Sequence, residues 1–314
     1  MKRFLMLFII LGSVSCICVV SANVDKNLGP SPLLHSDSNL NVGRIAAMAL
    51  SPTNANVMYA GAADGGVWKS INGGENWRFV SKDMPTTSIG SLAIDPNNEQ
   101  IIFAGTGESN YANHSRYGLG LFRSTDGGES WRLRSNTFQG RSISQLVINP
   151  NNSNIMYAAT THAGGFPARV AAKKHPNASG NLGVYKSIDA GATWQRLTGV
   201  PNLSVSSLVM NPNNSGNLLA AVGHIFGSAQ NGIYETSNAG NSWQKRSLPL
   251  SGETSSVLGR GTVAVSASNP DVWYAVYARA ASARGGGAYM QGLYRSNDGG
   301  NTWVARTAND AFSV

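Results

Sequence analysis

Pairs of short apolar runs separated by a polar turn recur five times along the chain. The first pair reads Met48-Ala49-Leu50-Ser51-Pro52 and then Met58-Tyr59-Ala60-Gly61, and the later copies begin at Leu92, Leu146, Leu208 and Val263. In the first four copies a proline stands just past the end of the first run, where its missing N–H costs a strand ladder nothing. No stretch shows helical periodicity, so the pattern predicts successive pairs of β-strands.

A third run follows each pair and leads into a turn that ends in tryptophan. These runs share the form Gly-apolar-aromatic-polar-Ser/Thr, and we expect third strands at 66–70, 120–124, 183–187, 232–236 and 292–296. The turn after each run fits S/T-x-D/N-x-G-x-x-W. Asp or Asn here can accept hydrogen bonds from backbone N–H groups two residues on, and glycine tolerates the positive φ angles of the turn. The tryptophan then begins a fourth strand and has a large ring to bury.

The five tryptophans stand at 77, 131, 194, 243 and 303, so that successive copies are 54, 63, 49 and 60 residues apart. Such a period indicates a propeller or a solenoid, because one unit cannot bury its apolar face alone. Four strands per repeat are typical of a β-propeller blade. We therefore predict an all-β propeller of five four-stranded antiparallel blades over residues 43–314, after an N-terminal extension at 23–42.

The repeated turn resembles the Asp-box, or BNR repeat, of the xyloglucanase-, sialidase- and sortilin (VPS10)-type propellers. The resemblance implies a six- or seven-bladed parent fold, of which this chain is a C-terminally incomplete member; alternatively, residues 27–42 close a five-bladed ring. It also implies that ligands bind at the end of the blades opposite these turns. The turn residues are then structural, namely Asn72, Trp77, Asp126, Trp131, Asp189, Trp194, Asn238, Trp243, Asp298 and Trp303.

The N-terminus has the pattern of a signal peptide. Lys2 and Arg3 precede an apolar run, and Val20-Ser21-Ala22 supplies small residues for cleavage before Asn23. We expect residues 1–22 to direct secretion or export to a periplasm, with no membrane span after cleavage; an uncleaved anchor is the alternative. Both cysteines, Cys16 and Cys18, lie in this segment, so the mature domain has no disulfide; lipidation at Cys16 is a further alternative.

Charge and composition narrow the choice of partners. The formal net charge is +8, but only 13% of residues are charged and no dense Lys/Arg run is interleaved with stacking aromatics. This pattern disfavours nucleic acid as a partner. No His/Cys/Asp cluster has the spacing of metal ligands, so we expect neither a metal nor a cofactor. The expected state is a monomer that binds a glycan or a peptide.

Two acidic residues are candidates for catalysis. Asp64 and Glu108 lie in equivalent loops, between the second and third strands of adjacent blades. Glycoside hydrolysis needs two carboxyl groups flanking the scissile bond. The resemblance to xyloglucanases implies a catalytic Asp in a T-D-x-G-G stretch, where this chain reads Ala62-Ala63-Asp64-Gly65-Gly66. Either the loop path differs by a residue and Asp64 serves, or Ala63 has replaced the catalyst; both acids can also be solvated loop residues.

Arginines and aromatic residues predict a basic rim on the same side. Arg44, Arg141 and Arg260 each follow a glycine where the chain enters an inner strand, which is the pattern of an anion cradle or of a packing role. Further candidates for substrate binding are Arg116, Tyr117 and Arg279, beside the long loops 161–182 and 278–291. The sequence thus favours an exported glycoside-hydrolase-like propeller acting on or binding a polysaccharide. The alternative is a non-catalytic, sortilin-type propeller that binds a peptide, a protein or an assembly partner.

Overall fold

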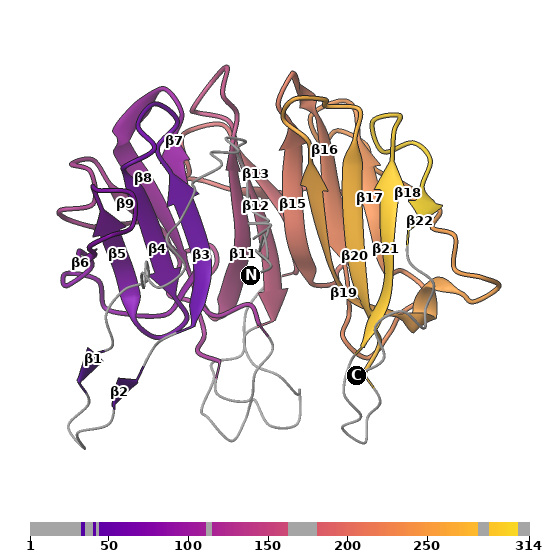
Figure 1. Cartoon of the computed structure of the whole chain (residues 1–314), viewed down its shortest axis with the longest axis horizontal. Coiled ribbons are helices and arrows are strands. Elements are labelled where there is room, and N and C mark those ends of the chain that lie inside the picture. The colour runs from indigo at the N-terminus through magenta and orange to yellow at the C-terminus, as the bar shows by residue number, and fades with distance from the viewer. Residues whose placement is uncertain are drawn as a thin grey trace, which may run out of the picture.

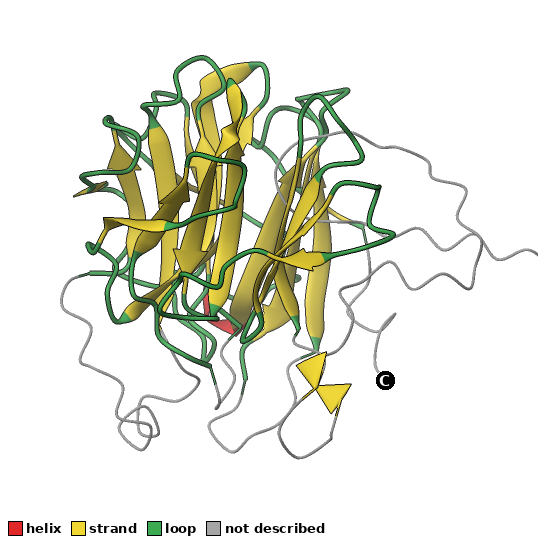
Figure 2. Cartoon of the chain, turned by 90° about the vertical axis from the view of Figure 1, so that its left-hand side faces the viewer, coloured by secondary structure: helices red, strands yellow, loops and turns green. Residues whose placement is uncertain are grey.

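The computed structural model of the chain describes residues 33–34, 40–41, 44–110, 115–162, 181–281 and 289–306. Five four-stranded antiparallel sheets make up nearly all of this part. The remaining elements are the short pair β1 (Leu33–Leu34) and β2 (Leu40–Asn41) and one 3₁₀ turn at Ser255–Val257. Figure 2 shows that this part of the chain consists of strands and loops with a single helical turn. The predicted signal peptide lies outside the described residues, as does most of the predicted extension.

Each sheet is formed by four strands that are consecutive in the chain, paired in sequence order. The first sheet holds β3 (Ile45–Leu50), β4 (Met58–Ala62), β5 (Gly66–Ser70) and β6 (Arg78–Phe79). The second holds β7 (Ile89–Asp95), β8 (Asn98–Thr106), β9 (Leu121–Ser124) and β10 (Arg132–Ser135). The third holds β11 (Arg141–Ile148), β12 (Met156–His162), β13 (Gly183–Ser187) and β14 (Gln195–Arg196). The fourth holds β15 (Val205–Asn211), β16 (Asn214–Val222), β17 (Gly232–Thr236) and β18 (Gln244–Arg246), and the fifth holds β19 (Leu258–Val265), β20 (Trp273–Arg279), β21 (Met290–Ser296) and β22 (Val304–Ala305).

The sheets stand face to face in chain order. In Figure 1 they run from the first sheet at the left to the fifth at the right, with the third between them. The first strands β3, β7, β11, β15 and β19 contact one another in this order and form the inner edge. The apolar cores lie between neighbouring sheets; Tyr59, Ile102 and Trp131, for example, join the first sheet to the second. The expected blade order is thus present, while the blade number of the parent fold stays a prediction.

Strand register makes positions in the five sheets comparable. An alanine of each second strand pairs with an apolar residue of the first strand, as in Met48↔Ala60 and Leu92↔Ala104. The other three pairs are Leu146↔Ala158, Leu208↔Ala220 and Val263↔Ala275. Residues at the same distance from these alanines are called equivalent below.

The five S/T-x-D/N-x-G-x-x-W segments, called the motif turns below, share one hydrogen-bond pattern. The Ser124 hydroxyl accepts from the Gly128 N–H at 2.8 Å and donates to Asp126 at 2.7 Å. Asp126 accepts from the Ser130 N–H at 3.0 Å, and the Asp or Asn of every other turn accepts from the N–H four residues on at 2.9 Å. This corrects the expected bond two residues on. Glycines at positive φ, such as Gly127 at 69° and Gly128 at 90°, curl the chain back far enough for the longer reach.

Contacts from one sheet to the motif turn of the next join the sheets. The Tyr59 hydroxyl of β4 and the Lys69 amine of β5 both donate to the Gly127 carbonyl at 2.8 Å. Two sheets further on, the Tyr157 hydroxyl and the Lys186 amine donate to the Ala239 carbonyl at 3.0 Å. Each lysine also lies over its tyrosine ring, with Nζ 5.5 and 5.6 Å from the two centroids. The side chains of one sheet thus position the turn of the next.

Candidate functional site

The loop face is the end of the sheets opposite the motif turns, where each second strand passes to the third. Five equivalent positions lie there, four residues after the paired alanine of each second strand. All five carry ionisable side chains, in chain order Asp64, Glu108, His162, His224 and Arg279. The sequence predicted Asp64 and Glu108 as acids and Arg279 as a binding residue, but neither histidine was among the predicted site residues. Counting from the alanines of the apolar pattern would have found them.

Crossed ion pairs join the first sheet to the second at this face. Arg44, just before β3, contacts the carboxylate of Glu108 after β8. In the opposite sense Arg116 of the second sheet donates from Nε to Asp64 of the first at 2.8 Å. Thr87 adds a hydrogen bond of 3.2 Å to the same oxygen of Asp64. The two candidate acids therefore belong to one network across a single sheet boundary.

The two acids differ in their access to solvent. Glu108 is 2% exposed, and its backbone is fixed by hydrogen bonds from its N–H to the Arg116 carbonyl and from the Ser142 hydroxyl to its own carbonyl, both of 3.0 Å. Asp64 is 53% exposed and Arg116 is 64% exposed. Because solvent screens an exposed ion pair, the Arg116–Asp64 pair is expected to be the weaker of the two. Asp64 is thus the accessible acid and Glu108 the enclosed one.

The loop of the first sheet presents position 64, and not position 63, to solvent. Ala63 is 3% exposed, and its N–H donates to the Arg44 carbonyl at 2.8 Å. An aspartate at position 63 would therefore place a carboxylate in a buried position. In the A-A-D-G-G stretch it is Asp64 that the loop exposes, while the choice between the two alternatives stays a prediction.

Arg260 and Arg279 bring the fifth sheet to the same face. Arg260 of β19 donates to the side-chain oxygen of Asn110 at 2.8 Å, which ties the fifth sheet to the loop of the second. Arg279 forms a fork with Glu253, with bonds of 2.6 and 3.1 Å, and donates to Gln291 at 2.9 Å. Through this fork Glu253 raises the pKa of Arg279, and Arg279 lowers the pKa of Glu253 below its usual value. The exposed ring of Tyr289 lies 5.8 Å from the guanidinium carbon of Arg279.

Arg141 belongs to the core and not to the surface. It is 3% exposed, and it donates to the Asn181 carbonyl at 2.6 Å, to the Tyr185 hydroxyl at 2.7 Å and to the Thr137 carbonyl. Its guanidinium also lies over the ring of Phe138. We therefore correct the predicted substrate-binding role of Arg141 to a structural one, because the guanidinium is buried and is held by two backbone carbonyls and a hydroxyl. Arg141 therefore adds no exposed guanidinium to the predicted cradle of Arg44, Arg141 and Arg260.

The two histidines stand on adjacent sheets. Burial, and to a smaller extent His224, lower the pKa of His162 below its usual 6.5. His224 stacks edge-on against Phe226, with ring centroids 5.8 Å apart, and its Nδ1 is buried without a hydrogen-bond partner among the described residues. Tyr117, half-buried next to Arg116, completes the described rim. His114 and most of the predicted loops 161–182 and 278–291 lie outside the described residues.

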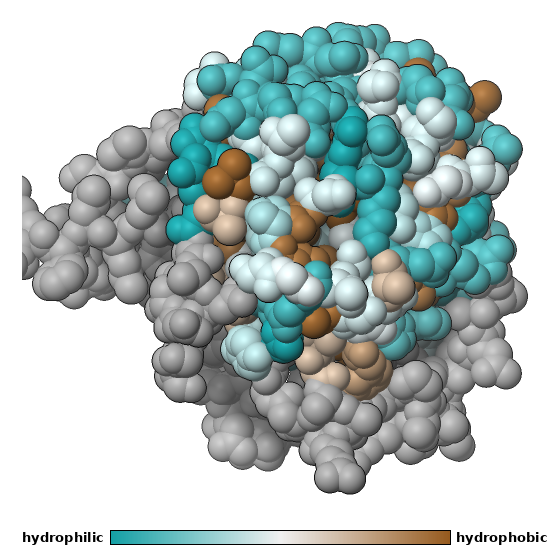
Figure 3. Space-filling view, turned by 90° about the vertical axis from the view of Figure 1, so that its right-hand side faces the viewer, coloured by the Kyte–Doolittle hydropathy of each residue, from teal (hydrophilic) through white to brown (hydrophobic). Residues whose placement is uncertain are grey.

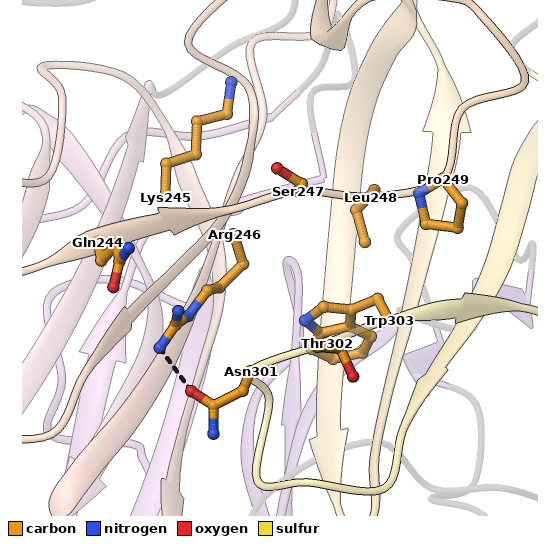
Figure 4. Close-up of a pocket in the computed structure, with 9 residues that line it drawn as sticks. All are labelled: Gln244, Lys245, Arg246, Ser247, Leu248, Pro249, Asn301, Thr302 and Trp303. Carbon is orange, nitrogen blue, oxygen red and sulfur yellow. Dashed lines mark hydrogen bonds between the residues drawn. The ribbon is translucent and has the colours of Figure 1, made fainter.

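A hollow of about 460 Å³ lies at the outer edge of the molecule, between β18 and the motif turn of the fifth sheet. This side is mostly hydrophilic with small apolar patches (Figure 3). Figure 4 shows Arg246 reaching Asn301 across the hollow, at 2.7 Å, with Leu248, Pro249 and Trp303 on the other wall. Arg246 is also paired with the buried Glu235, and Lys245 donates to the Ala229 carbonyl at 2.7 Å. No Asp or Glu is among the residues that line the hollow, whereas the loop face carries Asp64 and Glu108, so we place the candidate site on the loop face.

Two negative findings concern the described residues alone. Within the ranges given above, His, Cys, Asp and Glu side chains form no group of three or more that could hold a metal ion. In the same part of the chain, no helix has the length and apolar character needed to cross a membrane.

Comparison with known proteins relates half of the chain to polysaccharide-degrading enzymes. A xyloglucanase of a Paenibacillus species is 28% identical over 172 residues, which is 51% of this chain and 15% of that protein. The xyloglucanase of Hypocrea jecorina (strain QM6a) is 28% identical over 186 residues, 50% of this chain and 20% of that enzyme. The chain therefore spans no more than 20% of the length of these relatives. No protein-family model matches it.

Solved structures share the fold over most of the chain. An ancestral GH74 enzyme superimposes with a TM-score of 0.64 at 25% identity, over 92% of this chain and 34% of that one. The GH74 xyloglucanase from Xanthomonas campestris gives a TM-score of 0.60 at 20% identity, over 84% of this chain and 38% of its own. Together with the five four-stranded antiparallel sheets, these similarities confirm the predicted all-β propeller fold.

Proposed function

We propose that this chain is a glycoside-hydrolase-like propeller that acts on a polysaccharide at its loop face, with Asp64 and Glu108 as the catalytic pair. The observation that carries the proposal is the crossed network, which brings two carboxylates from adjacent sheets to one boundary. The similarity of half of the chain to xyloglucanases supports xyloglucan as the first polysaccharide to test.

Glycoside hydrolysis requires a different role of each of the two acids. One carboxyl must protonate the leaving oxygen, while the other acts as base or nucleophile. Each acid now contacts a guanidinium, so the acid that donates the proton has to leave its arginine when substrate enters. Arg116 is the more mobile partner because it is the more exposed, and it then becomes available to the hydroxyl groups of the sugar. Glu108 keeps its position through its backbone bonds.

Reducing-sugar release from xyloglucan tests this proposal. We expect Asp64→Asn and Glu108→Gln each to abolish release, while binding of the polysaccharide in affinity electrophoresis is retained. Asp126→Asn is the matched control, since it makes the same change in a motif turn and two of the five turns carry asparagine in the natural chain. Unchanged release in both site variants would refute the catalytic pair.

A binding protein without catalysis is the second candidate, and the ion pairing of both carboxylates favours it. The ligand would then be a glycan, or a peptide as in the sortilin-type alternative, held by the arginines of the loop face. In this case wild-type protein binds its ligand without hydrolysing it, and Arg116→Ala weakens binding. Arg141 is unsuitable for such a test because its substitution would disturb the core.

We also infer that residues 1–22 act as a signal peptide and that the motif turns are Asp-box repeats. The charged start, apolar run and small residues before Asn23 support the first inference. The common hydrogen bonds of all five turns support the second. N-terminal sequencing of protein recovered from the culture medium or periplasm tests export, and a chain that still begins at Met1 would contradict it.

A further inference from the structure

The fourth sheet lacks a side-chain contact that the other four sheets share. In those four, an aromatic residue precedes the paired alanine of the second strand, and the third-strand residue paired with it is a cation that lies over its ring. These pairs are Tyr59–Lys69, Phe103–Arg123, Tyr157–Lys186 and Tyr274–Arg295. In the fourth sheet the same pair is Leu219 and Glu235. Glu235 is 6% exposed, so an acid is buried where every other sheet places a cation.

This acid holds an arginine of the outer strand. Arg246 of β18 donates from Nε to Glu235 at 2.6 Å and from Nη2 to the side chain of Asn301 at 2.7 Å. Arg134 of the second sheet also stands three residues after a motif tryptophan, but it donates to two backbone carbonyls of the next motif turn. Arg246 is thus held at the wall of the hollow, and not against the turn backbone (Figure 4). Such a local departure from a repeated pattern is where a functional site is expected.

The polar wall of the hollow has unused hydrogen-bond donors. Nη1 of Arg246 has no acceptor among the described residues. The side-chain amide of Gln244, exposed at the start of β18, has no partner in that part of the chain either. The amine of Lys245 is held by a carbonyl and a hydroxyl, at 2.7 and 2.9 Å. The unused donors therefore belong to a guanidinium that an acid already contacts and to a neutral amide.

The opposite wall of the hollow is apolar. Leu248, Pro249 and Trp303 lie there (Figure 4), and the indole N–H of Trp303 donates to the Gly300 carbonyl at 2.9 Å, which fixes the ring. The volume of about 460 Å³ is within the usual range of small-molecule sites, which combine apolar walls with a few placed polar groups. A sugar residue has the matching surfaces, since its C–H face is apolar and its rim carries hydroxyl groups.

We propose that this hollow binds one sugar residue of a neutral polysaccharide and forms a second glycan-binding site, away from the loop face. The C–H face of the sugar packs on the apolar wall. Its hydroxyl oxygens accept hydrogen bonds from Nη1 of Arg246 and from the amide of Gln244. Because Glu235 already contacts the guanidinium, the hollow favours a neutral sugar over an anion. No acid lines the hollow, so the site binds without cleaving and goes beyond the proposed catalysis.

Amide hydrogen exchange, read by mass spectrometry, distinguishes this site from the loop face. The neutral probes are xyloglucan heptasaccharide, cellotetraose, mannotetraose and xylotetraose, and trigalacturonate is the anionic one. We expect at least one neutral probe to slow exchange in residues 244–250 of the natural chain several-fold.

Two exposed positions supply variants that leave the packed core intact. Gln244→Ala removes a donor and should raise the dissociation constant, taken from the concentration dependence of this protection, by about 3- to 10-fold. Ser247→Trp places a large ring in the hollow and should abolish the protection. Gln195→Ala is the matched control, because Gln195 is the exposed residue directly after the motif tryptophan of the third sheet. It should bind as the natural chain does.

Exchange in residues 244–250 that no neutral probe slows, or protection that persists in Ser247→Trp, would overturn the proposal. Protection by trigalacturonate alone would also overturn it, by assigning the hollow to an anion. Reducing-sugar release by Ser247→Trp is expected to equal that of the natural chain. Failure of this site would therefore leave the catalytic pair standing, and failure of the catalytic pair would leave this site standing.

Discussion

The hydroxyl of Tyr59 donates a 2.8 Å hydrogen bond to the carbonyl of Gly127, across the boundary between the first and second sheets. We expect Tyr59→Phe to keep the packed ring and lose this bond, at a cost of about 1 kcal/mol in the free energy of unfolding. Urea denaturation measures the change. Tyr274→Phe is the matched control and should cost nothing measurable, since its hydroxyl has no partner among the described residues. If Tyr59→Phe lowered the free energy of unfolding by no more than Tyr274→Phe does, the hydrogen bond of Tyr59 would contribute no net stability.

The motif turns depend on the buried hydroxyl at their start. Ser124 is 1% exposed, and its oxygen serves both the Gly128 N–H and the Asp126 carboxylate. Ser124→Ala leaves the N–H of Gly128 without an acceptor and should cost about 1–3 kcal/mol. Ser124→Thr should cost much less, because the fourth sheet uses Thr236 for the same bond at 3.0 Å. Denaturant midpoints of the two variants decide between a hydrogen-bond role and simple space filling.

Acid should weaken these same turns. Hydrogen bonds, first of all from the hydroxyl four residues on, lower the pKa of Asp126, Asp189 and Asp298 from 3.8 to about 2. The folded state therefore binds these protons less tightly than the unfolded state, so the contribution is present above pH 4 and lost as the pH falls toward 2. Replacing all three by asparagine should flatten the pH dependence of the unfolding midpoint in this range. An unchanged slope would assign acid sensitivity to other carboxylates.

Two turns hold alanine in the left-handed region. Ala190 and Ala239 have φ of 53° and 58°, where the other three turns have Gly73, Gly127 and Gly299 at 69–71°. This conformation costs a non-glycine residue about 1–2 kcal/mol, while glycine costs about 0.5–1 kcal/mol in chain entropy. Ala190→Gly should therefore be neutral or stabilise the fold by up to about 1 kcal/mol. A clear loss in thermal unfolding would show that the alanine methyl group packs to advantage.

The two arginines of the crossed network should differ in their effect on stability. Arg116→Ala removes an exposed pair and should change the unfolding free energy by less than about 1 kcal/mol. Arg44→Ala leaves Glu108, 2% exposed, without its cation and should cost about 1–3 kcal/mol. Chemical denaturation at low and high salt measures both, and the Arg116 effect should fade as salt rises. Equal, salt-sensitive losses would contradict the enclosed character of Glu108.

The fold could be predicted from the sequence because the same pattern of strands and turns occurs five times. Pro52, Pro96, Pro150 and Pro212 stand just past the ends of first strands, and a fourth strand begins directly after each tryptophan, so that each copy supports the assignment of the others. The hydrogen bond within the turn was harder to predict. It depends on how far successive positive φ angles curl the backbone, and residue types alone do not specify that distance.

The site could be predicted in part. Asp64 and Glu108 were found because equivalent loops of adjacent sheets lie side by side. The predicted binding role of Arg141 was wrong, because a shared Gly-Arg pattern does not ensure that the side chains share an orientation. Register shifts interrupt the first strands between Ile143 and Gln145 and between Leu258 and Gly261. Arg141 stands five residues before the paired Leu146 and Arg260 three residues before the paired Val263, so the two side chains meet different neighbours.

The motif turns and the loop face differ in the contacts that close them. Motif turns are closed by hydroxyl bonds between residues two to four positions apart, whereas the loop face joins residues 52, 64 and 150 positions apart. Local contacts form early and distant ones late, because long loops cost more entropy to close. During synthesis each motif turn is therefore expected to form as it leaves the ribosome. The loop face is expected to form only when later sheets are made, which leaves its loops free to diversify without disturbing how folding begins.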